Sequence, residues 1–160
     1  MKSIFFTVYG SPIAQPRTKA QGFVAKSGRV FAHVYEPGKA DSPARQWKHE
    51  VKEAAKKAMW GDAEPLEQPA LWDGPLHMTI RLFLPRPKSL FRKRDPNGAI
   101  FHAAGKDIDN LYKAIADALN GVIYRDDKQI AEVYIAKFYH EKNSRPRGEI
   151  RIEEINERTN

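Results

Sequence analysis

The chain contains no cysteine. Disulfide bonds, thiolate zinc sites and cysteine nucleophiles are therefore excluded, and the absence fits a reducing compartment such as the cytoplasm. No apolar run approaches the roughly 20 residues that a membrane-spanning helix needs. The short apolar run at residues 4–9 indicates a strand rather than the core of a signal peptide. We therefore expect a cytoplasmic protein that has no contact with a membrane.

Several catalytic motifs are also missing. The sequence has no glycine-rich phosphate loop ending in lysine and serine or threonine, and no serine in a nucleophile-elbow sequence. Its histidines show no metal-ligand spacing: His33, His49, His77, His102 and His140. Each is better interpreted as a surface or packing residue than as a catalyst.

Positive charge is what the chain has in excess. Its 160 residues carry a net charge of +7, with 41% hydrophobic residues. The length predicts one domain, residues 1–160, and the hydrophobic content is enough for a core. A pI of about 9.6 favours nucleic acid or another polyanion as the partner.

Hydrophobic periodicity predicts an α+β fold. Alternating apolar residues predict strands at residues 4–9, 76–84, 130–139 and 149–155, and a hairpin at 23–34 that turns at Ser27 and Gly28. Helical spacing predicts one helix that begins at Ser42 and Pro43, and a second over 109–120. Both faces of residues 4–9 are apolar, so this strand is expected inside the sheet. The order predicts two main helices packed on a small mixed β-sheet, with longer loops at 61–75 and 85–105.

The main chemical motif lies at the start of the second predicted helix. Asp107 and Asp109 are two residues apart, and Lys113 follows one helical turn after Asp109. One interpretation is structural: Asp109 caps the helix and pairs with Lys113, a surface contact worth only a few tenths of a kcal/mol. The other is a metal site that works on a polyanion. Taken alone, the motif leaves both open.

A second acidic pair favours the metal site. Asp126 and Asp127 precede the predicted strand at 130–139, and we expect them to converge with Asp107 and Asp109 if that strand pairs beside the one at 76–84. Converging carboxylates repel unless protonated or bridged by a cation. Oxygen ligands without sulfur or histidine favour Mg²⁺, with Mn²⁺ as a possible substitute. Such a site suits phosphodiester hydrolysis, in which Lys113 could stabilise developing charge or orient water.

Clustered cations supply candidate phosphate contacts. The segment 85–105 is strongly basic against a single acid, Asp95, and it leads directly into the acidic motif. A connection of this length in a compact domain is usually functional or disordered. The predicted DNA-binding residues are Arg17, Lys19, Arg86, Lys88, Arg92, Lys93, Arg94, Arg145 and Arg147.

Residues 106–113 and 117–130 resemble the RusA family of Holliday junction resolvases. The family pattern is Asp-x-Asp-Asn-Leu-x-Lys, then a helix, then Asp-Asp-x-Gln and a hydrophobic residue, and the chain matches it from Asp107 to Ile130. Residues 10–13, 16–17 and 145–150 resemble the family's two ends more loosely. There are two departures. Lys106 stands where many members have proline, which leaves the metal site intact, and Gln15 replaces the first arginine of an Arg-Pro-Arg region, which affects the details of DNA contact.

The resemblance implies a RusA-like, Mg²⁺-dependent homodimer that cuts four-way DNA junctions in recombination and repair. The family is common in phages and prophages. Its essential carboxylates would fall on Asp107, Asp109 and Asp127, with Asp126 adjacent, and its important lysine on Lys113. A dimer also suits the substrate physically, because a two-fold axis supplies two equivalent sites for symmetrical nicks.

Two alternatives remain open from the sequence. One is a Mg²⁺-dependent nuclease for flaps or other branched DNA. The other is a non-catalytic basic DNA-binding protein, in which the acidic residues serve as helix caps and ion pairs.

Overall fold

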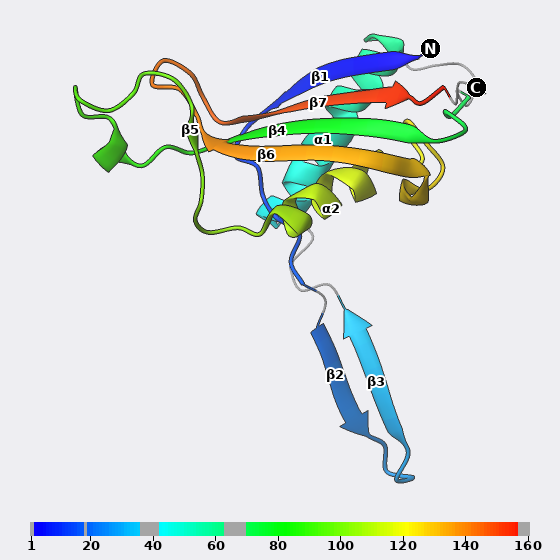
Figure 1. Cartoon of the computed structure of the whole chain (residues 1–160). Coiled ribbons are helices and arrows are strands. Elements are labelled where there is room, and N and C mark those ends of the chain that lie inside the picture. The colour runs from blue at the N-terminus through cyan, green and yellow to red at the C-terminus, as the bar shows by residue number, and fades with distance from the viewer. Residues whose placement is uncertain (1, 18, 36–41, 63–69, 157–160) are drawn as a thin grey trace.

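The structure is a computed structural model that describes residues 2–17, 19–35, 42–62 and 70–156 of the chain. A five-stranded mixed sheet forms its body (Figure 1), with the strand order β1 (Ser3–Tyr9), β7 (Arg147–Glu154), β4 (Leu76–Leu84), β6 (Ile130–Tyr139) and β5 (Ile100–Phe101). Only the β4 and β6 pair is parallel. The predicted α+β class is confirmed.

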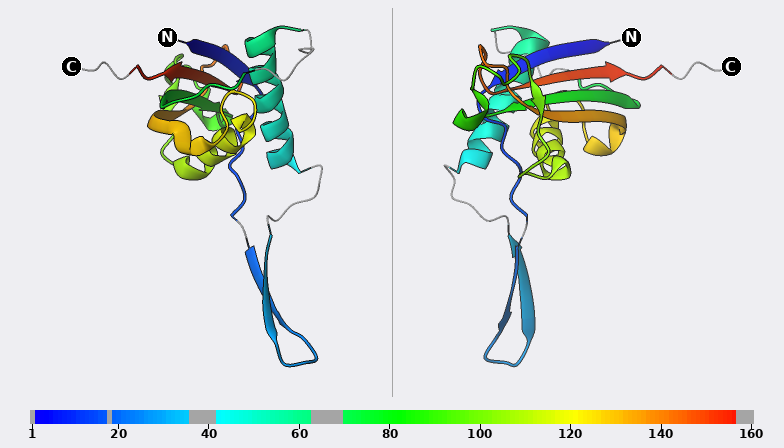
Figure 2. Two further views of the ribbon diagram at one scale, coloured as in Figure 1. Left: turned by 90° about the vertical axis from the view of Figure 1, so that its right-hand side faces the viewer. Right: turned by 60° about the vertical axis from the view of Figure 1, so that its left-hand side comes forward.

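Two helices cover one face of this sheet. They are α1 (Pro43–Trp60) and α2 (Ile108–Leu119), and Figure 2 shows both on the same side of the strands. Apolar residues three and four apart give each helix a buried stripe, which packs on alternate residues of β4. The largest core side chains include Trp47 from α1 and Leu111, Ile115 and Leu119 from α2. Neither helix, nor any other helix in the described residues, is long and apolar enough to span a membrane.

The connection from β4 to β6 decides where the chemical motifs lie. Since these strands are parallel, the chain must return along the sheet between them, and α2 makes this return. Its first residue therefore lies at the end of the sheet where β4 and β6 finish, and its last residue lies at the end where β6 begins (Figure 1).

The basic segment between β4 and α2 is ordered. It contains the short helix η1 (Lys88–Leu90) and strand β5. Arg86 is buried and donates hydrogen bonds to the carbonyls of Leu90, Pro96 and Gly98, at 2.9, 2.7 and 3.1 Å. The Lys142 ammonium ties the same segment to the turn after β6 through the carbonyls of Arg92 and Asp95.

The predicted hairpin is confirmed and projects from the body. Strands β2 (Lys19–Val24) and β3 (Val30–Tyr35) pair only with each other (Figures 1 and 2). Gly28 takes the positive φ of 77° that the tight turn requires. Part of the predicted loop at 61–75 falls on residues 63–69, which lie outside the described residues.

The expectation that residues 4–9 form an internal strand is wrong. Within the described chain β1 pairs only with β7 and forms an edge of the sheet. Phe5 and Tyr9 point to the face without helices and remain about half exposed. Arginines cover their rings instead of a second layer: Arg151 lies 5.8 Å from the Phe5 centroid and Arg145 lies 3.8 Å from that of Tyr9.

Candidate active site

The first acidic pair lies exposed at the start of α2. Asp107 occupies the N-cap position with extended backbone, but its side chain makes no capping hydrogen bond. Asp109 lies in the first turn, where the helix dipole favours a carboxylate. Both side chains are solvent-exposed. The capping interpretation placed Asp109 at the cap, but the structure places Asp107 there, and the Asp107 carboxylate is exposed and does not cap the helix.

The N-terminal loop packs against this pair. The Arg17 guanidinium lies 3.1 Å from the Asp107 carboxylate. Lys106 donates to the carbonyl of Pro12 at 2.7 Å, and the Gln15 amide donates to the carbonyl of Asn110 at 3.0 Å. Burial lowers the pKa of Lys106. Lys106 thus anchors the loop that carries Arg17 beside the site.

A second lysine fixes the segment before α2 against the face of the sheet that the helices cover. Lys137, on the helix-covered side of β6, donates to the carbonyl of Lys106 at 2.6 Å. Lys113, by contrast, is exposed. In the part of the chain that the structure describes, no acidic oxygen lies within 4.0 Å of its ammonium. The ion pair with Asp109 that the structural interpretation of the motif required is absent, which leaves Lys113 available to a substrate.

The second acidic pair is held in a rigid turn by Gln129. Its side-chain oxygen accepts from the amides of Arg125 and Asp126, and its side-chain nitrogen donates to the carbonyl of Trp72 at 2.9 Å. The Asp126 carboxylate accepts from the Lys128 amide at 3.0 Å, and this hydrogen bond lowers the pKa of Asp126. Asp127 begins the short helix η2 (Asp127–Gln129), immediately before β6.

Two tyrosines connect this turn to α2. Tyr124 is buried and its hydroxyl donates to the carbonyl of Ala116 at 2.9 Å. Burial raises the pKa of Tyr112 on α2, and the negative charges of Asp127 and Asp117 raise it further. Asp127 therefore lies near Tyr112 on α2, close enough for its negative charge to raise the pKa of the tyrosine hydroxyl. The supporting roles of Tyr124 and Gln129 depend on contacts that no spacing in the sequence signals.

The two acidic pairs do not converge within one chain. They lie at opposite ends of α2, whose 12 residues span roughly 18 Å. Among the described residues no group of three or more acidic, histidine or cysteine side chains could hold a metal ion. The expected convergence overlooked that a helix joining two parallel neighbouring strands places its two ends at opposite edges of the sheet. Asp107 and Asp109 alone still fit Mg²⁺, which often takes one or two protein carboxylates and completes its shell with water.

Most of the predicted DNA-binding cations are exposed. They are Arg17, Lys19, Lys88, Arg92, Lys93, Arg94 and Arg145. The basic segment after β4 and the turn before β7 lie at the end of the sheet where α2 begins (Figure 1). Asp107 and Asp109 therefore lie at the same end of the sheet as the cations of these two segments.

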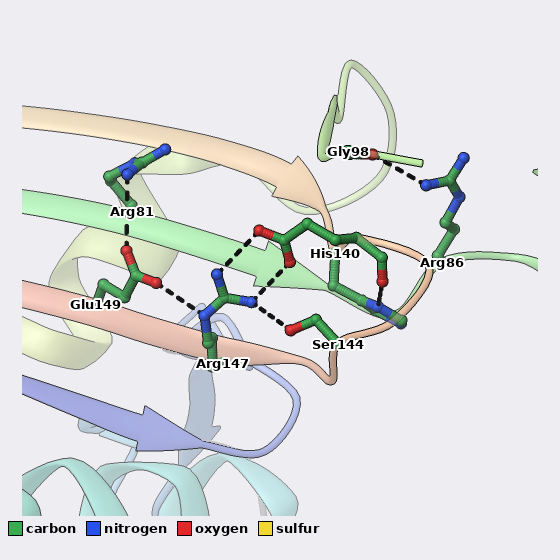
Figure 3. A network of polar contacts seen from close by, with 8 residues as sticks. Arg81, Arg86, Gly98, His140, Ser144, Arg147 and Glu149 are labelled. Atoms are coloured by element: carbon green, nitrogen blue, oxygen red, sulfur yellow. Dashed lines mark hydrogen bonds and ion pairs between the residues drawn. The ribbon is translucent and has the colours of Figure 1, made fainter. Parts of the chain in front are cut away.

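The prediction is wrong for Arg86 and Arg147. Arg86 is buried, and its guanidinium already donates hydrogen bonds to the three backbone carbonyls described above. The Arg147 guanidinium contacts Glu149 and Ser144 (Figure 3) and also Glu141. Each of these three distances is 2.8 Å, and the guanidinium lies 3.7 Å from the centroid of Phe83. Both arginines stabilise the fold, because their donors are already satisfied inside the protein.

Comparison with known proteins identifies the family of this chain. A family model described as endodeoxyribonuclease RusA matches residues 10–153. The chain belongs to the RusA family. It is also 31% identical over 160 residues to the uncharacterized protein YqaN of Bacillus subtilis (strain 168), a match that covers 97% of this chain and 99% of the relative. RusA membership supports nuclease chemistry, and the matched range contains both acidic pairs.

Proposed function

We propose that this RusA-family protein is a Mg²⁺-dependent endodeoxyribonuclease that resolves four-way DNA junctions during recombination and repair. The observation that carries the proposal is the exposed pair Asp107 and Asp109 at the start of α2, at the same end of the sheet as the exposed cations of the 85–105 segment and of the turn before β7. Family membership supports the reaction class, and the exposure of Asp107 and Asp109 supports their choice as the reacting site.

Each residue has a defined role in the proposal. Asp107 and Asp109 would hold Mg²⁺, with Mn²⁺ as a substitute, and the ion would supply an activated water and neutralise charge on the phosphate. Arg17, which pairs with Asp107 at 3.1 Å, is placed to contact a phosphate beside these carboxylates. Lys113, one turn above Asp109, stabilises the developing negative charge. The exposed cations of the 85–105 segment hold neighbouring phosphates.

A four-way junction is the proposed substrate because it offers two equivalent strands. A homodimer with two-fold symmetry presents two identical sites to them, and symmetrical nicks result. No specific observation favours flaps or other branched DNA, so these remain outcomes of the test. Location in the cytoplasm, where DNA is accessible to a bacterial or phage enzyme, remains a prediction.

One assay tests the proposal. Synthetic four-way junction, flap and duplex DNA are incubated with the wild type and with Asp109→Asn, with and without Mg²⁺. We expect paired, symmetrical nicks only in the junction and only with Mg²⁺, and a loss of at least about 100-fold in Asp109→Asn. The variant should bind the junction as well as the wild type or better, since it removes a negative charge near phosphates.

The other outcomes separate the alternatives. Equal cutting of flap and junction would refute junction specificity. A wild type that binds but never cuts would identify a DNA-binding protein without catalytic activity. Loss of binding in a folded Asp109→Asn variant would contradict its role as a metal ligand.

A further inference from the structure

The β2–β3 hairpin exposes aromatic rings that the rest of the described chain does not cover. Its two strands pair only with each other, and every described side chain on them is exposed. Phe23 and Phe31 lie opposite one another, with stacked rings whose centroids are 5.8 Å apart. Phe23 is 54% exposed and Phe31 is 46% exposed, so a large part of each ring is open to solvent. Since an isolated two-stranded hairpin is only marginally stable in water, exposed rings on it indicate a partner.

The charge of the hairpin identifies the kind of partner. Residues 19–35 contain Lys19, Lys26 and Arg29 and no acidic residue. Lys26 and Arg29 flank the turn at Ser27 and Gly28, and both are exposed. A cationic element without acids fits a nucleic acid. It does not fit a second copy of this chain, whose own net charge is +7.

The hairpin begins beside the first acidic pair, near the start of α2 (Figures 1 and 2). Arg17 contacts Asp107 and precedes Lys19, the first residue of β2, by two positions. Phe23 follows Arg17 by six residues, which extend over at most about 20 Å. Phosphates of one DNA strand are about 3.4 Å apart along the helix axis, so the rings reach DNA within about six nucleotides of a phosphate at Asp107.

Unstacked bases fit the hairpin better than an intact duplex does. A two-stranded ribbon that reads the major groove uses polar side chains to contact base edges. Close to its turn this hairpin carries apolar side chains instead: Phe23, Val24, Val30 and Phe31. Phenyl rings stack on the faces of bases, and in a duplex those faces already stack on neighbouring base pairs. The branch point of a junction, where the strands exchange between arms, interrupts this stacking and leaves base faces open.

We infer that the β2–β3 hairpin binds the branch point of the DNA junction, where Phe23 and Phe31 stack on unstacked bases. Lys26 and Arg29, at the turn, contact the phosphates next to these bases. The inference deepens the proposed function and rests on it for the four-way junction as substrate. It adds the element that distinguishes a junction from duplex DNA, and this recognition can be measured without cutting.

Matched substitutions test the stacking. Phe23→Leu/Phe31→Leu keeps apolar side chains but removes both aromatic faces, whereas Phe23→Tyr/Phe31→Tyr keeps those faces. Affinities for a synthetic four-way junction and for duplex DNA are measured without Mg²⁺, so that nothing is cut. We expect the double leucine variant to lose at least about 10-fold in junction affinity and less than about 3-fold in duplex affinity. The double tyrosine variant should bind the junction within about 3-fold of the wild type.

A third substitution controls for the general loss of an exposed ring. Phe5 is also 54% exposed, but it lies on β1 in the body of the protein. Phe5→Leu should therefore leave junction affinity unchanged. Amide chemical shifts of residues 19–35 in NMR spectra report whether the hairpin is still formed in the double leucine variant.

Photocrosslinking locates the contact without any substitution in the protein. 5-Iodouracil replaces one thymine at the branch point, or one thymine inside a duplex arm, and irradiation joins this base to an aromatic side chain stacked on it. We expect a crosslink only from the branch point. The attachment should map to Phe23 or Phe31, which trypsin separates into the peptides 20–26 and 30–39.

Lys26→Ala/Arg29→Ala tests the phosphate contacts at the turn. Each lost contact lowers the slope of log affinity against log salt by about one, so the double variant should lower the slope on the junction by about two. An unchanged slope would contradict the placement of the turn beside phosphates.

The remaining outcomes decide against the inference. Equal losses on junction and duplex in the double leucine variant would indicate a groove contact instead of stacking at the branch point. Unchanged junction affinity with a folded hairpin, or a branch-point crosslink that maps outside the hairpin, would show that the rings do not bind these bases. A change in sedimentation of the double leucine variant with unchanged junction affinity would assign the rings to a second copy. A wild type that binds the junction but never cuts it contradicts the proposed function alone, because every measurement of the hairpin is made without Mg²⁺.

Discussion

The ion pair between Glu141 and Arg147 should make stability depend on pH in acid. Arg147 donates to both carboxylate oxygens of Glu141, at 2.8 and 3.0 Å, and also to Glu149 at 2.8 Å. The Arg147 side chain is 14% exposed and that of Glu141 is 32% exposed. These bonds lower the pKa of Glu141 from its ordinary value of 4.5 to about 2. The perturbation we choose is Glu141→Gln, which preserves shape and removes the charge.

The size of the effect follows from this shift. One unit of pKa is worth about 1.36 kcal/mol, so the ion pair contributes at most about 3 kcal/mol to the free energy of unfolding. Partial exposure of Glu141 screens the pair, which reduces the expected loss in the variant to about 2 kcal/mol at pH 7. Because the folded pKa is depressed, the contribution is fully present above about pH 4.5 and is lost as the pH falls toward 2.

Urea unfolding followed by tryptophan fluorescence measures the effect. We expect the wild type to exceed Glu141→Gln by about 2 kcal/mol at pH 7 and 5, with a smaller difference at pH 3. The control is Glu53→Gln, whose exposed pair with Lys56 at 2.8 Å should contribute almost nothing. A difference that stays constant from pH 7 to pH 3 would refute the reasoning, because it would show that the charge of Glu141 is not what stabilises the fold.

Three further changes probe the buried contacts and one probes the surface. Tyr124→Phe removes a buried hydroxyl donor and should cost about 1 kcal/mol in urea unfolding. Arg86→Met leaves three carbonyls without their donor and should cost more than about 2 kcal/mol by the same measurement. At Gly148 an added Cβ would lie 3.4 Å from the Trp47 ring, so Gly148→Val should lower the free energy of unfolding by about 1–3 kcal/mol. Lys93→Ala should leave stability unchanged but reduce the slope of log affinity against log salt by about one in a junction-binding titration.

The local sequence predicted most of the secondary structure. The alternation in β4 and the helical spacing in α1 and α2 are strong because each of these elements buries one face or stripe against the core. The β1 strand was misjudged for a related reason: its second apolar face is covered by Arg145 and Arg151, whose positions depend on the pairing of β1 with β7. A sequence pattern shows that a face is apolar but not what covers it.

The sequence also does not show which basic residues are buried and which are exposed. Arg86 and Lys93 lie in the same basic segment, and nothing in their spacing distinguishes them. In the structure Arg86 is buried against carbonyl oxygens while Lys93 is exposed. The partners of Arg86 lie up to 12 residues away in a loop without periodicity, so only the folded chain selects them.

By itself, the sequence determined the class of fold, the basic character of the protein and the acidic motif at Asp107 and Asp109, because composition and short spacings specify these locally. Only the tertiary structure decided that Asp126 and Asp127 lie at the far end of α2 from that motif. The reason is the parallel pairing of β4 and β6, a contact between residues about fifty positions apart along the chain, which forces α2 to run back along the sheet and separates its two ends.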